Sequence, residues 1–196
     1  MVIEGYKRQD GSKVENAYND FELQKFRNIC KEHISHPSIK TVLDYGGGGS
    51  DWDKEGFEPS NGASAKQFFD VNTVTTFEPA RNQMDKKHSD CVVCMDVLEH
   101  IFLTDIANLV DELFSLTKKL LVINVACYKA AALLPNGENA HITVRNPDWW
   151  KNKSLTEKII RGIEYSGLTS YWLDINNFVE VSSYNNFGIR PLFGQE

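Results

Sequence analysis

The sequence predicts an α/β protein with a mostly parallel sheet, helices on both of its faces and an antiparallel hairpin at the C-terminal end. Short apolar strands alternate with amphipathic helical segments, which is typical of parallel βα units. Two extended segments are separated only by Asn176-Asn177, which predicts antiparallel strands joined by a tight turn. The length of 196 residues fits a single domain over residues 1–196, with residues 1–15 as a loose N-terminal segment.

The strand prediction rests on short segments in which apolar and β-branched side chains dominate. The first of them runs directly into four glycines, and the second ends at Glu78-Pro79. The predicted strands are residues 39–45, 71–77, 91–95, 120–126, 170–175 and 178–184.

Helices are predicted where apolar residues recur every three or four positions. Ile106, Leu109 and Val110 form such a face. Ser154 and Glu157 form a capping box at the start of the last helix. The predicted helices are residues 16–34, 64–69, 104–116 and 154–167.

The composition indicates a globular cytoplasmic protein. The hydrophobic fraction is 41%, the charged fraction is 24% and the formal net charge is −6. An acidic chain without a Lys/Arg cluster lacks the basic face that binds nucleic acid, so we expect no nucleic-acid partner. The longest apolar stretch, residues 120–127, is interrupted by Asn124 and is far shorter than the ~20 residues of a membrane helix. We therefore expect no membrane partner, and the first residues show no apolar signal core.

The four cysteines do not form a disulfide scaffold, which favours a reducing compartment. Cys91 and Cys94 form a C-x-x-C pattern inside a predicted strand. Side chains three positions apart on a strand point to opposite faces, so this pair cannot hold a metal. We expect both thiols in the core.

Ligands of parallel sheets bind beyond the carboxyl ends of the strands. The first strand ends in Asp44, followed after Tyr45 by a glycine turn that lets a ligand approach the backbone. In a dinucleotide fingerprint that begins at Gly46 and Gly48, the last glycine position would be Asp51, whose carboxylate repels a pyrophosphate. The turn therefore suits a nucleoside without phosphates, and Asp44 is placed to hold an amine.

The next two strands also end in polar residues. Glu78 is placed to accept hydrogen bonds from a ribose diol, and Pro79 to lie flat against a base. The third strand ends in the segment Asp96-Val97-Leu98-Glu99-His100-Ile101, the most specific signal in the chain.

Together, the segments DYGGGG, FEP and DVLEHI resemble the class I S-adenosylmethionine-dependent methyltransferases, a Rossmann-like family with a seven-stranded sheet. The resemblance covers residues 38–127 by motif and the rest by element order. Residues 134–150 also resemble a signature of a bacterial and phage subgroup of unassigned substrate. The resemblance implies methyl transfer with S-adenosyl-L-methionine as cofactor and no metal.

The resemblance also implies roles for individual residues. Asp44, Gly46 and Gly48 match the turn that holds the methionine end of the cofactor, and Glu78 matches the ribose-binding acid. Asp96 and Val97 match the segment that lines the sulfonium side. The implied cofactor-binding residues, with Pro79 against the base, are Asp44, Gly46, Gly48, Glu78, Pro79, Asp96 and Val97.

The chain departs from the family pattern at two places. More residues separate Asp44 from Glu78 than the ~20 of dinucleotide folds, and the extra loop, residues 50–66, is interpreted as a candidate lid. Residues 80–89 leave little room for a third strand, which we expect to be shortened or missing. The acid that contacts the adenine amine has no clear match, with Asp85 a poor candidate.

Methyl transfer is an in-line displacement in which the protein mainly supplies positioning. A general base is needed only if the acceptor loses a proton, and His141 is the candidate catalytic residue. We expect the acceptor, a small molecule or a sugar, to contact His100, Tyr128 and Trp150. For each of these side chains, packing or loop hydrogen bonding is the competing interpretation.

Two alternatives remain open at this point. A nucleotide-sugar or NAD-dependent enzyme would respond to NAD and not to S-adenosylhomocysteine. A non-catalytic binding or scaffolding member of the same fold would show a partner-sized interface and no cofactor uptake.

Overall fold

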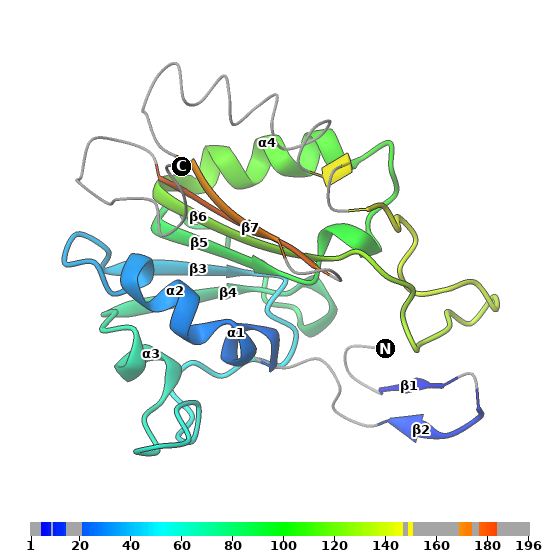
Figure 1. The fold of residues 1–196 in the computed structure, drawn as a ribbon, viewed down its shortest axis with the longest axis horizontal. Coiled ribbons are helices and arrows are strands. Elements are labelled where there is room, and N and C mark those ends of the chain that lie inside the picture. The colour runs from blue at the N-terminus through cyan, green and yellow to red at the C-terminus, as the bar shows by residue number, and fades with distance from the viewer. Residues whose placement is uncertain are drawn as a thin grey trace.

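The computed structural model describes residues 5–8, 10–14, 21–146, 149–150, 169–173 and 177–183. Its centre is a six-stranded sheet in the order β4-β3-β5-β6-β8-β7 (Figure 1). The first four of these strands are parallel, and β8 and β7 are antiparallel to their neighbours, as predicted. The strands are β3 (Thr41–Tyr45), β4 (Thr73–Phe77), β5 (Ser89–Met95), β6 (Thr117–Ala126), β7 (Thr169–Leu173) and β8 (Asn177–Ser183).

Helices cover both faces of this sheet (Figure 1). On one face, Cys30 and Ile34 pack with the first core cluster; on the other, Ile106, Val110 and Leu113 pack with the second. The helices are α1 (Phe21–Lys25), α2 (Arg27–Ile34), α3 (Ala65–Phe68) and α4 (Ile106–Leu116), with two short 3-10 turns, η1 (Pro79–Arg81) and η2 (Leu98–His100).

Strand β5 shows why the sheet needs two cores. Cys91 and Val93 belong to the first cluster, whereas Val92 and Cys94 belong to the second. This is the two-residue alternation of a strand that is buried on both faces. The prediction that the C-x-x-C thiols lie in the core on opposite faces is confirmed.

The N-terminal segment differs from the prediction of a loose lead-in. Its described part forms a small antiparallel hairpin of β1 (Tyr6–Lys7) and β2 (Lys13–Val14). Arg8 forms an isolated bridge to Ala132, which ties the hairpin to the chain after β6 (Figure 1). Local antiparallel pairing and one bridge to a distant segment therefore both contribute to the structure of these residues.

Other elements follow the sequence with local differences. The described part of the first predicted helix is divided at Phe26 into α1 and α2. Strand β4 lies at the edge of the described sheet, and no strand occurs between η1 and β5, as expected for a missing third strand. The helix predicted for residues 154–167 lies outside the described residues. Among the described helices, none has the length and apolar character that a bilayer crossing requires.

The loop between the glycine turn and α3 is docked against the helices. Trp52 and Phe57 are buried in the first core cluster. The guanidinium Nε of Arg27 lies 2.9 Å from a carboxylate oxygen of Glu58, and the side-chain amide of Gln24 donates to the Phe57 carbonyl. These contacts fix the loop on the α1–α2 side of the sheet.

Candidate functional site

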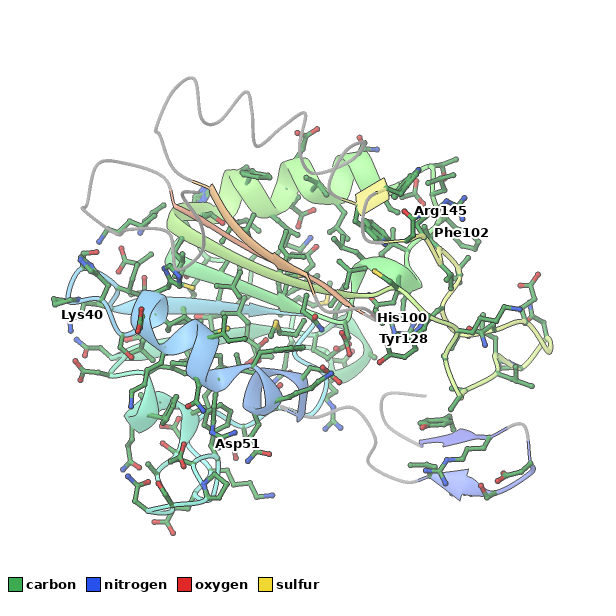
Figure 2. The ribbon with its side chains drawn as sticks, in the orientation of Figure 1. Lys40, Asp51, His100, Phe102, Tyr128 and Arg145 are labelled. Carbon is green, nitrogen blue, oxygen red and sulfur yellow. The ribbon has the colours of Figure 1, made fainter. Side chains whose placement is uncertain are left out.

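The strand order places a topological switch point between β3 and β5. The chain continues from β3 to β4 on one side and then crosses to β5 on the other. Such a switch leaves a crevice beyond the carboxyl ends of the strands, where α/β proteins bind ligands. Lys40 precedes β3 at the amino end of the strands, whereas His100 and Tyr128 lie together at the opposite end (Figure 2).

Two adjoining cavities occupy this end of the sheet. The larger has a volume of about 500 Å³ and the smaller about 250 Å³. Gly46, Gly48, Asp96 and His100 line both cavities, so these four residues form the boundary between two connected halves of one site.

The two halves differ in chemistry. Apart from the four shared residues, the larger cavity is mostly apolar, and Glu78 is the one carboxylate among its described lining residues. The smaller cavity has acidic, imidazole and phenol groups in its lining. The larger adds Phe77, Glu78, Pro79, Val97, Ile101 and Leu109, and the smaller adds Tyr6, Glu22, Tyr128, Ala131 and His141.

The turn after β3 requires glycine because side chains approach it closely. Gly46 has φ +75°, and its N–H donates to the Phe77 carbonyl at 2.7 Å. A Cβ at this position would lie 2.5 Å from a methyl group of Val97, and a Cβ on Gly47 would clash with the Asp44 carboxylate. Packing against the ends of β4 and β5 therefore shapes the turn that separates the cavities.

Glu78 follows β4 and is held in a fixed orientation. Its side chain is buried (7% exposed), with one carboxylate oxygen accepting the Gly48 N–H at 2.9 Å and the other the Ala80 N–H at 3.0 Å. Because each carboxylate oxygen can accept more than one hydrogen bond, both keep capacity for ligand hydroxyls. The carboxylate thus joins the glycine turn to the wall of the larger cavity.

Asp96 follows β5 in a strained backbone conformation, with φ +53°. Its N–H donates to the Asn124 carbonyl at 3.0 Å, and the Asn124 side-chain amide donates to its carboxylate. Burial, reinforced by the nearby Glu22, raises the pKa of Asp96 to about 7. The neighbouring strand β6 therefore holds this carboxyl group at the boundary of the two cavities.

The smaller cavity has an acidic character. Glu22 and Asp96 both line it, and Glu22 is 3.4 Å from the ammonium group of Lys25. Among the described residues, neither cavity is lined by a Lys or Arg side chain. Such a site attracts a cationic ligand and disfavours a pyrophosphate. Sequence analysis missed Glu22; the available signal was an acid in the first turn of an amphipathic helix.

Two imidazoles and a phenol gather at the carboxyl ends of β5 and β6. Nδ1 of His100 donates to the Ala140 carbonyl at 2.8 Å, and Nδ1 of His141 donates to the Tyr128 carbonyl. Because a carbonyl only accepts, the lone pair of each neutral ring lies on Nε2. The centroids of the two imidazole rings are 4.9 Å apart, and burial lowers the pKa of both histidines. The structure thus brings His141, the candidate catalytic residue, together with His100 and Tyr128, two of the residues predicted to contact the acceptor.

Three predicted or considered residues lie elsewhere. The Asp44 carboxylate is buried, accepts the indole N–H of Trp52 at 2.8 Å and lines neither cavity, unlike the predicted amine-binding group. Trp150 is fully buried in the second core cluster rather than in the acceptor pocket, because packing there removes a large apolar ring from water. Asp85 pairs with Lys87 and also lines neither cavity.

The candidate lid does not reach the site either. Residues 50–66 line neither cavity, and the buried rings of Trp52 and Phe57 hold this loop on the α1–α2 side. In this structure the loop therefore does not cover the site, and its role as a lid stays a prediction. The remaining predicted residues, Gly46, Gly48, Glu78, Pro79, Asp96, Val97, His100, Tyr128 and His141, all line one or both cavities.

Comparisons with known proteins concern the fold. No protein-family model and no curated protein sequence matches the chain. A solved O-methyltransferase family protein from Burkholderia thailandensis matches with a TM-score of 0.48 and 11% identity, over 86% of this chain and 59% of that one. A SAM dependent methyltransferase from Archaeoglobus fulgidus matches with a TM-score of 0.45 and 10% identity, over 84% and 92%. The N-terminal domain of EvdMO1, solved with SAH and D-fucose, matches with a TM-score of 0.43 and 13% identity, over 93% and 91%. The chain thus spans less than two thirds of the first of these proteins.

Proposed function

We propose that the protein is a methyltransferase that uses S-adenosyl-L-methionine and a small-molecule or sugar acceptor. The observation that carries this proposal is the pair of adjoining cavities around the Gly46–Gly48 turn, one apolar and lined by the fixed carboxylate of Glu78, the other lined by Glu22 and Asp96. When bound, the cofactor supplies a methyl group on a sulfonium ion that is already activated for transfer.

The larger cavity suits adenosine. Its volume of about 500 Å³ lies within the range of about 300–1,000 Å³ that is usual for small-molecule sites. Phe77, Pro79 and Leu109 offer apolar surface to a base, and the fixed carboxylate of Glu78 offers two oxygens to a ribose diol. Val97 also lines this cavity and directly follows Asp96, one of the four residues that the two cavities share.

The smaller cavity suits the charged end of the cofactor and the acceptor. Glu22, and Asp96 above its pKa of about 7, provide negative potential for a sulfonium and an ammonium group. Tyr128 and His141 lie on the same cavity, and the Nε2 lone pair of His141 is the basic group that we assign to the acceptor's proton.

An NAD-dependent activity is less compatible with this geometry. Dinucleotide sites place the pyrophosphate at the N-terminus of a helix that directly follows the glycine turn. Here the first helix after the turn, α3, starts only at Ala65, and a docked loop comes between. The absence of Lys and Arg from the described lining residues agrees with a ligand that has no phosphates.

Calorimetric titration of the purified chain with S-adenosylhomocysteine tests the proposal. We expect saturable binding at one site with a micromolar Kd, and no heat with NAD under the same conditions. A titration with no saturable heat for S-adenosylhomocysteine would contradict the assignment, and saturation by NAD alone would favour the dinucleotide alternative.

A further inference from the structure

We propose that Glu99, His100 and His141 bind a divalent transition-metal ion at the wall of the smaller cavity. One ligand atom from each residue, a carboxylate oxygen and two imidazole nitrogens, lies within 4.8 Å of the other two. The two histidines line the smaller cavity, so an ion held here faces the proposed acceptor.

The carboxylate of Glu99 is the first reason to expect a cation. Its side chain is 0% exposed, one oxygen accepts the Ala126 N–H at 3.0 Å, and the other is buried without a hydrogen-bond partner among the described residues. A buried carboxylate oxygen without a partner is costly, and a bound cation would satisfy it.

The orientation of the two imidazoles is the second reason. Metal-bound histidines usually donate their other ring N–H to a carbonyl or carboxylate, which fixes the tautomer and aims the ring. His100 and His141 both have this arrangement, with their Nδ1 atoms donating to the carbonyls of Ala140 and Tyr128. The lone pairs are therefore on Nε2 in both rings, as ligation requires.

The backbone holds the two ligand-bearing segments together. The Thr143 N–H donates to the Glu99 carbonyl at 2.9 Å, and the Thr143 hydroxyl donates to the Ile101 carbonyl at 2.7 Å. These bonds connect the 3-10 turn after β5 to a segment more than 40 positions later in the chain. The site is thus built by tertiary contacts rather than by one mobile loop.

The ligand set indicates which metals fit. Ligand atoms that lie about 2.0–2.2 Å from one tetrahedral ion are about 3.3–3.6 Å apart, so ligand atoms at the 4.8 Å limit must approach one another by about 1.2–1.5 Å when the ion binds. Two imidazoles and one carboxylate suit Zn²⁺, Mn²⁺ or Fe²⁺, whereas Mg²⁺ and Ca²⁺ prefer oxygen ligands. Three protein ligands leave a coordination position open for water or a substrate.

The role of this open coordination position rests on the proposed function. A bound ion with an open position beside the acceptor would bind a hydroxyl oxygen and lower the pKa of that hydroxyl, and the released proton would pass to solvent. His141 would then act on the acceptor through the ion. The acceptor class is accordingly an alcohol, a phenol or a sugar hydroxyl.

Titration of the EDTA-treated full chain with Zn²⁺ alone, followed by calorimetry, tests the metal site. We expect one equivalent to bind, and His141→Ala and Glu99→Gln each to weaken binding at least tenfold. The matched control is His88→Ala, which removes an exposed histidine outside the cluster and should leave binding unchanged. Addition of Co²⁺ should produce visible absorption bands that the His141→Ala variant lacks.

Three results separate this proposal from the proposed function. Absence of saturable Zn²⁺ binding, or binding equal in the wild type and in both cluster variants, overturns the metal site. Binding of S-adenosylhomocysteine to the EDTA-treated chain supports the cofactor assignment independently of the metal. Retained S-adenosylhomocysteine binding by His141→Ala shows that this variant is folded, so a lost metal signal then supports the site.

Discussion

Replacement of Glu78 by Gln is expected to weaken S-adenosylhomocysteine binding by about 10- to 100-fold. The carboxylate oxygens accept the N–H groups of Gly48 at 2.9 Å and Ala80 at 3.0 Å, and Gln has only one oxygen with which to accept both. The amide NH₂ must therefore face a backbone donor or the ribose hydroxyls. A hydrogen bond to a charged group contributes about 1.5–3 kcal/mol, and 1.4 kcal/mol corresponds to a tenfold change in Kd.

Calorimetric titration of both proteins measures this loss, with the exposed loop variant Glu55→Gln as the matched control. The 2′-deoxy analogue of S-adenosylhomocysteine separates the loss of a ribose contact from a disturbance of the glycine turn. If Glu78 binds the ribose, removal of the 2′-hydroxyl weakens binding to the wild type but has little further effect on Glu78→Gln. A Kd for Glu78→Gln within threefold of the wild type, or the same loss with the analogue in both proteins, would refute the reasoning.

Two further predictions concern stability. Trp52→Phe removes the 2.8 Å hydrogen bond to the buried Asp44 carboxylate and is expected to lower the free energy of unfolding by about 2 kcal/mol in urea titrations. An equal loss in an Asp44→Ala background, which has no acceptor for the indole N–H, would show that this bond is unimportant. Burial lowers the pKa of His33 to about 4 from 6.5, so the folded state resists protonation and loses stability as the pH falls from 6.5 to 4. At about 1.36 kcal/mol per pKa unit, His33→Leu should remove about 3 kcal/mol of this loss in the free energy of unfolding. The control variant His88→Leu should keep the loss. Equal pH profiles of the free energy of unfolding for the two variants would contradict the assignment.

The sequence predicted several lining residues of the larger cavity because these residues lie at strand ends. Gly46, Glu78 and Asp96 each follow a strand that is apolar enough to recognise, and parallel strands bring their carboxyl ends to one edge. The positions of these residues therefore follow from local patterns and one general rule of α/β folds. The missing third strand was predictable for the same reason, since residues 80–89 are too few for a strand and a helix.

The parts that depend on contacts between distant segments were not predictable. Glu22 and Tyr6 reach the smaller cavity because α1 and the N-terminal hairpin pack beside the switch point. Trp52 occurs in a polar loop, and nothing local shows that its indole pairs with Asp44 below the glycine turn. Trp150 likewise reads as a binding-site aromatic until the core that encloses it is known.

The bonds that Thr143 makes to the chain after β5 have a consequence for how specificity can change. Most of the larger cavity and of the boundary between the two cavities comes from residues 41–100, whereas residues 128–143 contribute much of the smaller cavity. Under the proposed function, exchange of residues 128–143 would change the acceptor while the cofactor-binding cavity stays intact, provided that Thr143 is retained. A change of acceptor would then require no change in the strands of the sheet.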